Sequence, residues 1–122
     1  MGFTHLKVFV GNPTELTRGR EIEFLVDTGS FYTMIPREIL EEVGVVPIKE
    51  QILTLADGRE ISRQVGVAFL SYKGQPGGTL VVFGEEEDET LLGVLGLESM
   101  GYKLDPIKME LEPIKLLLTY QA

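Results

Sequence analysis

Residues 24–36 read FLVDTGSFYTMIP, and the single acid inside this stretch decides how the whole chain is interpreted. An apolar run with a high tendency to form β-structure ends directly at Asp27, and the turn-forming sequence Thr-Gly-Ser follows. We expect a carboxylate in this position to be partly buried. Because an unpaired buried charge is costly, we expect Asp27 to have a partner or a chemical task.

The composition limits the possible functions. The chain has 122 residues, so we expect one domain, residues 1–122, large enough for a hydrophobic core. Its apolar fraction of 43% and charged fraction of 25% are ordinary for a soluble globular protein. The net charge is −8, and no stripe of basic residues occurs anywhere in the sequence. Nucleic acid and anionic membranes are therefore not expected as partners.

The same sequence predicts a cytoplasmic protein. The first residues, MGFTHLKVFVGNP, lack a long apolar segment and a cleavage site, so we expect no signal peptide. No apolar run approaches 18 residues, so we expect no membrane span. The chain has no cysteine, which excludes disulfides and thiol chemistry and by default favours the cytoplasm.

The apolar pattern of the first half predicts strands around one short helix. Strands are expected at residues 6–10 and 21–26. A helix is expected over 36–43, because a proline opens it and Gly44 suits the position after its end. Residues 53–69 predict a β-hairpin whose tip is the Asp-Gly pair at 57–58.

The second half continues the β pattern. A hairpin is expected over 67–83, with its loop at 73–78, and a short helix over 94–100. One or two terminal strands are expected within 107–120. The acidic run 85–89 lacks the spacing of a calcium loop and is interpreted as a solvated loop. The predicted class is mainly β, a small closed or folded-over fold with one or two short helices.

The sequence lacks the residues that most catalytic mechanisms need. The only histidine is His5, and no G-x-S-x-G sequence exists to supply a serine nucleophile. One histidine and no cysteine cannot build a normal zinc site. The glycines of 73–78 lack both a following helix and a Lys-Ser/Thr pair, so a phosphate site is not expected. We therefore expect no metal and no cofactor, which leaves Asp27 as the residue to explain.

Several segments of the chain resemble those of a known family. FLVDTGS is similar to the active-site segment of aspartic proteases, and TLLGVLGLESMGYKLDP (90–106) is similar to a later segment of retropepsin-like proteases. TMIP (33–36) and LTLADGRE (53–60) lie between them, as in the cellular, non-viral branch. The resemblance covers residues 24–111. It implies a retropepsin-like acid protease fold, a small closed β-barrel with a flap hairpin.

The resemblance also implies roles for residues. The chain is expected to be an aspartic endopeptidase that acts on peptides or proteins through a water molecule, with a flap at 53–65. In such enzymes two carboxylates share one proton. The implied catalytic residues are Asp27, Thr28 and Gly29. The implied substrate-binding residues are Ser30, Ala56, Asp57, Gly58, Leu92 and Gly93, and the last two are also expected to pack under the loop that carries Asp27.

The sequence holds a single Asp-Thr-Gly, and its other aspartates occur in Ala-Asp-Gly, Glu-Asp-Glu and Leu-Asp-Pro. The second carboxylate must therefore come from Asp27 of an identical subunit, which predicts a homodimer with the site on its twofold axis. Ser30 stands where retroviral members usually have alanine, and its hydroxyl is expected to donate a hydrogen bond to the outer oxygen of Asp27.

Other interpretations stay open. The chain could be a retropepsin-like peptide-binding or dimerisation module that does not cleave. It could also be a small β domain in which Asp27 only forms an Asx-turn with its own backbone. Residues 57–58 could be an ordinary exposed turn, and residues 116–120 could be either an interface strand or a core strand.

Overall fold

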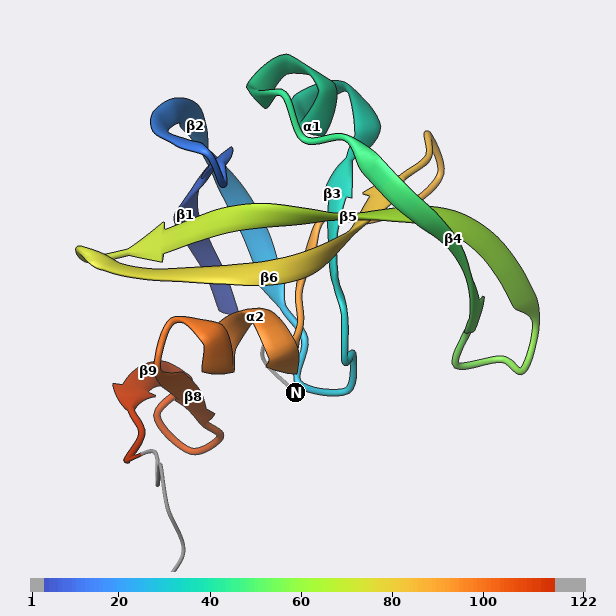
Figure 1. Ribbon diagram of the computed structural model, residues 1–122. Helices are drawn as coiled ribbons and strands as arrows, with labels where there is room; N and C mark the ends of the chain where they lie inside the picture. Colours follow the sequence, from blue (N-terminus) through green and yellow to red (C-terminus); the bar gives the residue numbers. More distant parts are fainter. Residues whose placement is uncertain (1–3, 116–122) are drawn as a thin grey trace, which may run out of the picture.

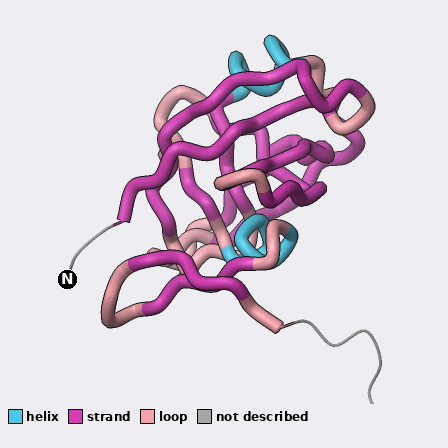
Figure 2. The backbone as a smooth tube through the Cα atoms, turned by 90° about the vertical axis from the view of Figure 1, so that its left-hand side faces the viewer, coloured by secondary structure: helices cyan, strands magenta, loops and turns pink. Residues whose placement is uncertain are grey.

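The computed structural model describes residues 4–115 of the chain (Figure 1). Strands dominate it, and the two helices are short (Figure 2), so the prediction of a mainly β chain is confirmed. In chain order the elements are β1 (Thr4–Asn12), β2 (Glu15–Val26), β3 (Thr33–Pro36), α1 (Arg37–Val43), β4 (Pro47–Thr54), β5 (Glu60–Tyr72), β6 (Gln75–Gly84), β7 (Leu91–Leu92), α2 (Val94–Ser99), β8 (Tyr102–Asp105) and β9 (Glu110–Pro113). None of the helices in this part of the chain is long and apolar enough to cross a membrane.

The main sheet closes on itself. Its strand order is β1-β2-β7-β3-β6-β5-β4, and β1 also pairs with β5, through Phe9–Gly11 and Phe69–Ser71. The strands from β1 to β5 in this order therefore form a continuous hydrogen-bonded ring. β4 lies outside the ring and pairs with β5 in an antiparallel hairpin. This arrangement leaves the far end of the β4–β5 hairpin projecting from the body of the molecule (Figure 1).

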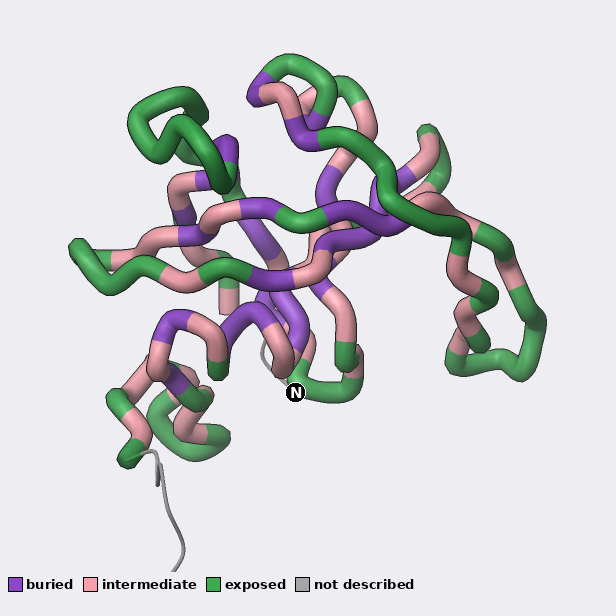
Figure 3. Tube along the Cα trace, viewed as in Figure 1, coloured by how far each residue is buried: buried purple, intermediate pink, exposed green. Residues whose placement is uncertain are grey.

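The core fills the ring. Alternate residues of the strands point inward, as a period of two requires, and the middle parts of β5 and β6 are buried whereas the tip of the β4–β5 hairpin is exposed (Figure 3). Each fully buried aliphatic or aromatic side chain contributes about 1.5–3 kcal/mol. The largest fully buried side chains are Phe24, Phe83, Ile35, Leu40, Leu70 and Leu92.

Helix α1 forms where it was predicted. Pro36 precedes it, Leu40 and Val43 are buried against the core, and Gly44 ends it in the left-handed conformation with φ of +84°. The N–H of Gly44 donates to the carbonyl of Glu41, which completes the end of the helix.

The C-terminal part differs from the prediction. Strand β9 lies within the expected range 107–120, but Ile107 itself is 91% exposed in the turn that joins β8 to β9. The reason is Asp105, whose Oδ1 accepts hydrogen bonds from the N–H groups of Ile107 and Lys108 and so starts a turn. The open question about residues 116–120 lies outside the described residues.

Candidate active site

Asp27 stands at the end of β2, where the chain leaves the sheet. Its Oδ1 accepts a hydrogen bond of 2.9 Å from the N–H of Gly29, and its carbonyl accepts one of 3.1 Å from Ser30. An Asx-turn is therefore present, formed by the side chain of Asp27 and the backbone N–H of Gly29. The side chain is only partly buried, and within residues 4–115 its carboxylate has no further hydrogen bond or ion pair. The turn orients one oxygen and leaves the other available.

Strand β7 supports this loop from the side. It pairs in parallel with β2, with Leu25 opposite Leu91 and Val26 opposite Leu92. The N–H of Asp27 donates to the carbonyl of Leu92 at 3.0 Å, which extends the pairing by one residue. The position of the Asp27 backbone is therefore set by β7, which lies far from Asp27 in the sequence.

The start of helix α2 also supports the loop. The first N–H groups of the helix have no partner within it, and here Val94 donates to the carbonyl of Ser30 at 2.9 Å and Leu95 to that of Phe31 at 3.0 Å. The N–H of Gly93 donates to Thr33 Oγ1 at 3.1 Å. Three residues of the loop and β3, Ser30, Phe31 and Thr33, thus accept hydrogen bonds from the start of α2.

Leu92 and Gly93 pack against the Asp27 loop and do not line the cleft. Leu92 is completely buried. A Cβ atom on Gly93 would lie 2.3 Å from the carbonyl oxygen of Tyr32 and 2.8 Å from that of Ser30. Both residues therefore pack under the loop, as was also predicted, and a substrate in the cleft has no access to Leu92. Of the two roles predicted for them, the contacts of the described chain show the supporting one.

A cleft of about 880 Å³ lies between the Asp27 loop and the β4–β5 hairpin. Five of the predicted site residues line it, Asp27, Gly29, Ser30, Ala56 and Asp57. Thr28 and Gly58 are exposed next to it but are not on its wall. The remaining lining residues are mostly apolar and include Phe31, Tyr32, Met34, Ile52, Leu53, Leu55, Ile61, Val82 and Leu91.

The hairpin tip carries a compensated charge. Leu55 and Arg59 are joined by a backbone hydrogen bond of 2.8 Å, and Gly58 makes the turn with φ of +90°. The backbone N–H of Arg59 and its guanidinium both bond the carboxylate of Asp57, at 3.0 and 2.8 Å, and these bonds lower the pKa of Asp57. The charges of Asp57 and Arg59 therefore cancel at the tip.

Ser30 does not contact the carboxylate as expected. Its hydroxyl donates to the carbonyl of Tyr32 at 2.8 Å. A hydroxyl has one proton, so in this arrangement it has none left for Asp27. The predicted hydrogen bond from Ser30 to Asp27 is wrong, because the hydroxyl donates to the loop carbonyl two residues ahead instead.

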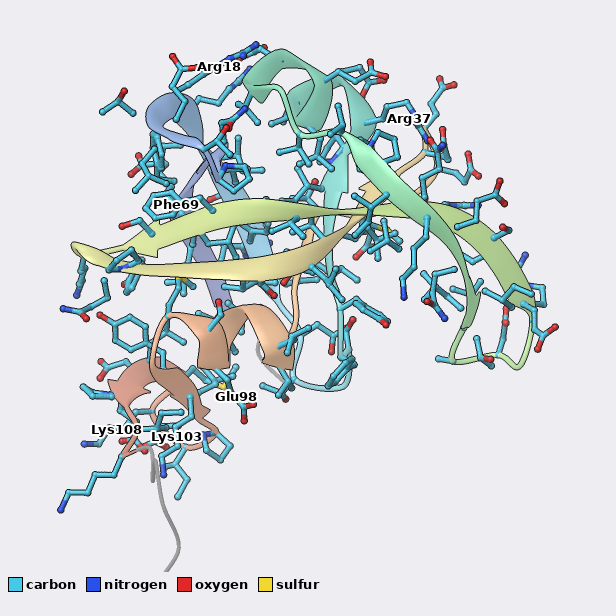
Figure 4. All side chains as sticks on the ribbon, in the orientation of Figure 1. Arg18, Arg37, Phe69, Glu98, Lys103 and Lys108 are labelled. Atoms are coloured by element: carbon cyan, nitrogen blue, oxygen red, sulfur yellow. The ribbon has the colours of Figure 1, made fainter. Side chains whose placement is uncertain are left out.

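The acidic run 85–89 is not simply solvated. Arg63 of β5 forms two hydrogen bonds with Asp88, at 2.7 and 3.1 Å, and both side chains are nearly buried, 13% and 12% exposed. At the other end of the run, Arg37, labelled in Figure 4, bonds Glu85 at 2.7 Å. These pairs fasten the base of the hairpin and the start of α1 to the segment that leads into β7.

The Arg63–Asp88 pair makes stability depend on pH. The guanidinium of Arg63, with a smaller contribution from the N–H of Glu85, lowers the pKa of Asp88. Because its pKa is lower in the folded than in the unfolded protein, Asp88 adds stability above its unfolded value of about 4, and this is lost as pH falls through the lowered value. We expect Asp88→Asn to lower the free energy of unfolding at pH 7 by about 1–3 kcal/mol.

Urea unfolding of both proteins between pH 7 and pH 2 checks this expectation. The difference between them should shrink toward acid, where Asp88 of the parent becomes neutral as well. Glu86→Gln removes a charge from an exposed position in the same segment and serves as the control. A difference that stays constant over the whole pH range would contradict an ionic origin.

Comparisons with known proteins agree with this geometry. A family model described as aspartyl protease matches residues 13–98. The solution structure of the protease of simian foamy virus (mac) is similar with a TM-score of 0.52 at 20% identity, covering 74% of this chain and 87% of that one. The crystal structure of a retropepsin-like aspartic protease from Rickettsia conorii is similar with a TM-score of 0.53 at 21% identity, covering 85% and 77%. A search of curated proteins found no match. The expected retropepsin-like fold is confirmed.

Proposed function

Because the chain belongs to the aspartyl protease family, we propose that it is an aspartic endopeptidase whose two catalytic carboxylates are the Asp27 residues of two identical subunits. The observation that carries this proposal is the state of Asp27: it lines the cleft, and among residues 4–115 no cation neutralises it. The other aspartate on the cleft wall, Asp57, is already bonded to Arg59. Over the described residues, one chain therefore supplies a single aspartate without a cationic partner to the wall of the cleft.

The surroundings of Asp27 support an assembly through this loop. Thr28 and Gly29 are exposed in the single chain, although they sit beside a carboxylate and next to the firmly held backbone of Ser30. In the proposed dimer the two loops face each other across the twofold axis, and Thr28 makes the contact that keeps the carboxylates in register. The cleft then continues from one subunit into the other.

The chemistry needs one proton shared by the two carboxylates. Since like charges about 3 Å apart do not both ionise, one group stays protonated where the other is charged. The charged Asp27 removes a proton from a water molecule, whose oxygen attacks the peptide carbonyl carbon. The protonated Asp27 of the second subunit donates its proton to the carbonyl oxygen. The proton taken from water then passes to the amide nitrogen. The C–N bond breaks as the carbonyl group re-forms, one hydroxyl group of the intermediate returns its proton to the carboxylate pair, and an acid and an amine are released.

A cleavage assay tests the proposal. The protein is incubated with an unfolded protein or a peptide library across pH, with and without pepstatin, and products are identified by mass spectrometry. We expect internal peptide-bond cleavage that pepstatin abolishes. Peptides that bind in the cleft and are never cut would show a peptide-binding module instead.

Dilution tests the assembly. If the carboxylate pair forms between subunits, the specific activity should fall as the protein is diluted through the dimer dissociation constant. Light scattering over the same concentrations gives the molecular mass. A stable monomer with full specific activity would rule out the shared site.

A further inference from the structure

A second hollow, of about 310 Å³, opens beside the cleft under the β4–β5 hairpin. It is at the lower end of the volumes of ligand pockets, about 300–1,000 Å³. Most of its wall is shared with the cleft, so the two are continuous. The shared residues are Met34, Leu55, Arg59, Ile61, Glu89 and Leu91.

We propose that this hollow takes a lysine or arginine side chain of the peptide substrate, and that Glu89 binds its cation. The inference rests on the proposed function, because it names the kind of peptide that the Asp27 cleft accepts. It goes beyond that function in assigning a selective residue, Glu89, that sequence analysis did not select.

The apolar part of the wall suits the stem of such a side chain. Met34, Leu55, Ile61 and Leu91 line the hollow together. Lysine and arginine cover apolar surface with their methylene groups while their charged end stays near water or a carboxylate. A short or acidic side chain would leave this apolar wall uncovered or would bring a charge toward it.

The charged part of the wall favours a cation. Arg63 is fully engaged by Asp88 and also lies 3.3 Å from Glu87. Arg59 is engaged by Asp57 on the cleft side. Over residues 4–115, Glu89 makes no ion pair and no side-chain hydrogen bond, although it is on the wall of both cavities.

An incoming cation therefore meets an uncommitted carboxylate. The carboxylate of Glu89 would repel an incoming anion. The guanidinium groups of Arg59 and Arg63 would not offset this repulsion, because each is already paired with an acid. The net charge of the chain, −8, acts in the same direction, because it attracts basic peptides to the surface before they reach the cleft.

The experiment compares peptides that differ only in charge at one position. Fluorogenic peptides cut by the parent are scanned on both sides of the cleaved bond with lysine, glutamine and glutamate. At one or more of the scanned positions, lysine should raise kcat/KM by roughly twofold to fivefold over glutamine, the range for an exposed ion pair. Glu89→Gln should remove this preference, and Glu89→Lys should turn it into a preference for glutamate.

Glu86→Gln is the matched control, because it removes the same charge from the same segment at an exposed residue that lines neither cavity. It should keep the lysine preference. A parent that cleaves without preferring lysine at any position would overturn the inference, as would a preference that survives in Glu89→Gln.

A binding measurement separates this inference from the proposed function. Fluorescence anisotropy with labelled peptides that differ only by lysine, glutamine or glutamate at one position is recorded on Asp27→Asn, with and without Glu89→Gln. Tighter binding of lysine peptides that depends on Glu89, in a protein whose parent never cleaves, would support the hollow and overturn the protease. Absence of both cleavage and binding would overturn both.

Discussion

Asp27→Asn is expected to reduce peptide cleavage by at least about 10²-fold, the lower limit for removal of a positioned general base. The amide does not accept the proton of the attacking water. The fold should stay intact, because the side-chain oxygen of asparagine still accepts the N–H of Gly29, which is the one hydrogen bond that the carboxylate makes in the described chain. The measurement is kcat/KM on a peptide substrate, with circular dichroism to confirm the fold.

The same variant reports on the dimer. Near neutral pH the parent dimer has to keep one of the two facing carboxyl groups protonated, which costs free energy. Two amides carry no charge and have no such cost, so the variant should dimerise at least as tightly as the parent. Asp105→Asn is the control, since it makes the same chemical change in the β8–β9 turn, far from the cleft wall. Cleavage by Asp27→Asn at more than a few per cent of the parent rate would move the chemistry to another residue.

Gly93→Ala is expected to damage both the fold and the site. The new methyl group would lie 2.3 Å from the carbonyl oxygen of Tyr32. That atom belongs to the backbone, so no flexible side chain can move aside. Overpacking of this kind typically costs about 1–3 kcal/mol. Because the neighbouring N–H groups of Val94 and Leu95 hold the carbonyls of Ser30 and Phe31, relief of the clash displaces the Asp27 loop.

Activity should therefore fall by more than the loss of folded protein explains. Thermal unfolding and kcat/KM at a temperature where the variant is fully folded separate the two effects. Gly78→Ala is the matched control, because nothing lies within 4 Å of the added Cβ atom there. A fully folded Gly93→Ala with parental kcat/KM would show that the loop tolerates displacement.

The sequence predicted the parts of the site that depend on local chemistry. Asp27 could be found because an acid directly after an apolar strand is unusual, and the hairpin tip because Asp-Gly between two strands favours a turn. Helix α1 followed from Pro36 and Gly44. Each of these signals lies within a few residues of the feature that it predicts.

The sequence did not predict features that depend on distant contacts. The bonds of Arg63 to Asp88 and of Arg37 to Glu85 join segments 25 and 48 residues apart, so the run 85–89 read as uniformly solvated. Glu89 is one of several glutamates in that run, and only its place on the wall of two cavities distinguishes it. The hydroxyl of Ser30 donates to the carbonyl of Tyr32, a choice of acceptor that depends on the conformation of the loop and not on its sequence.

The support of the Asp27 loop by β7 and α2 also determines when this loop can be completed during synthesis. The hydrogen bond between Thr33 and Gly93 joins residues 60 positions apart. At a translation rate of about 5–20 residues per second, the loop waits roughly 3 to 12 s for its supports to be made. Under the proposed dimer, two finished chains must then meet. A chain in which residues 93–95 have not yet been made therefore lacks the hydrogen bonds that hold the loop after Asp27.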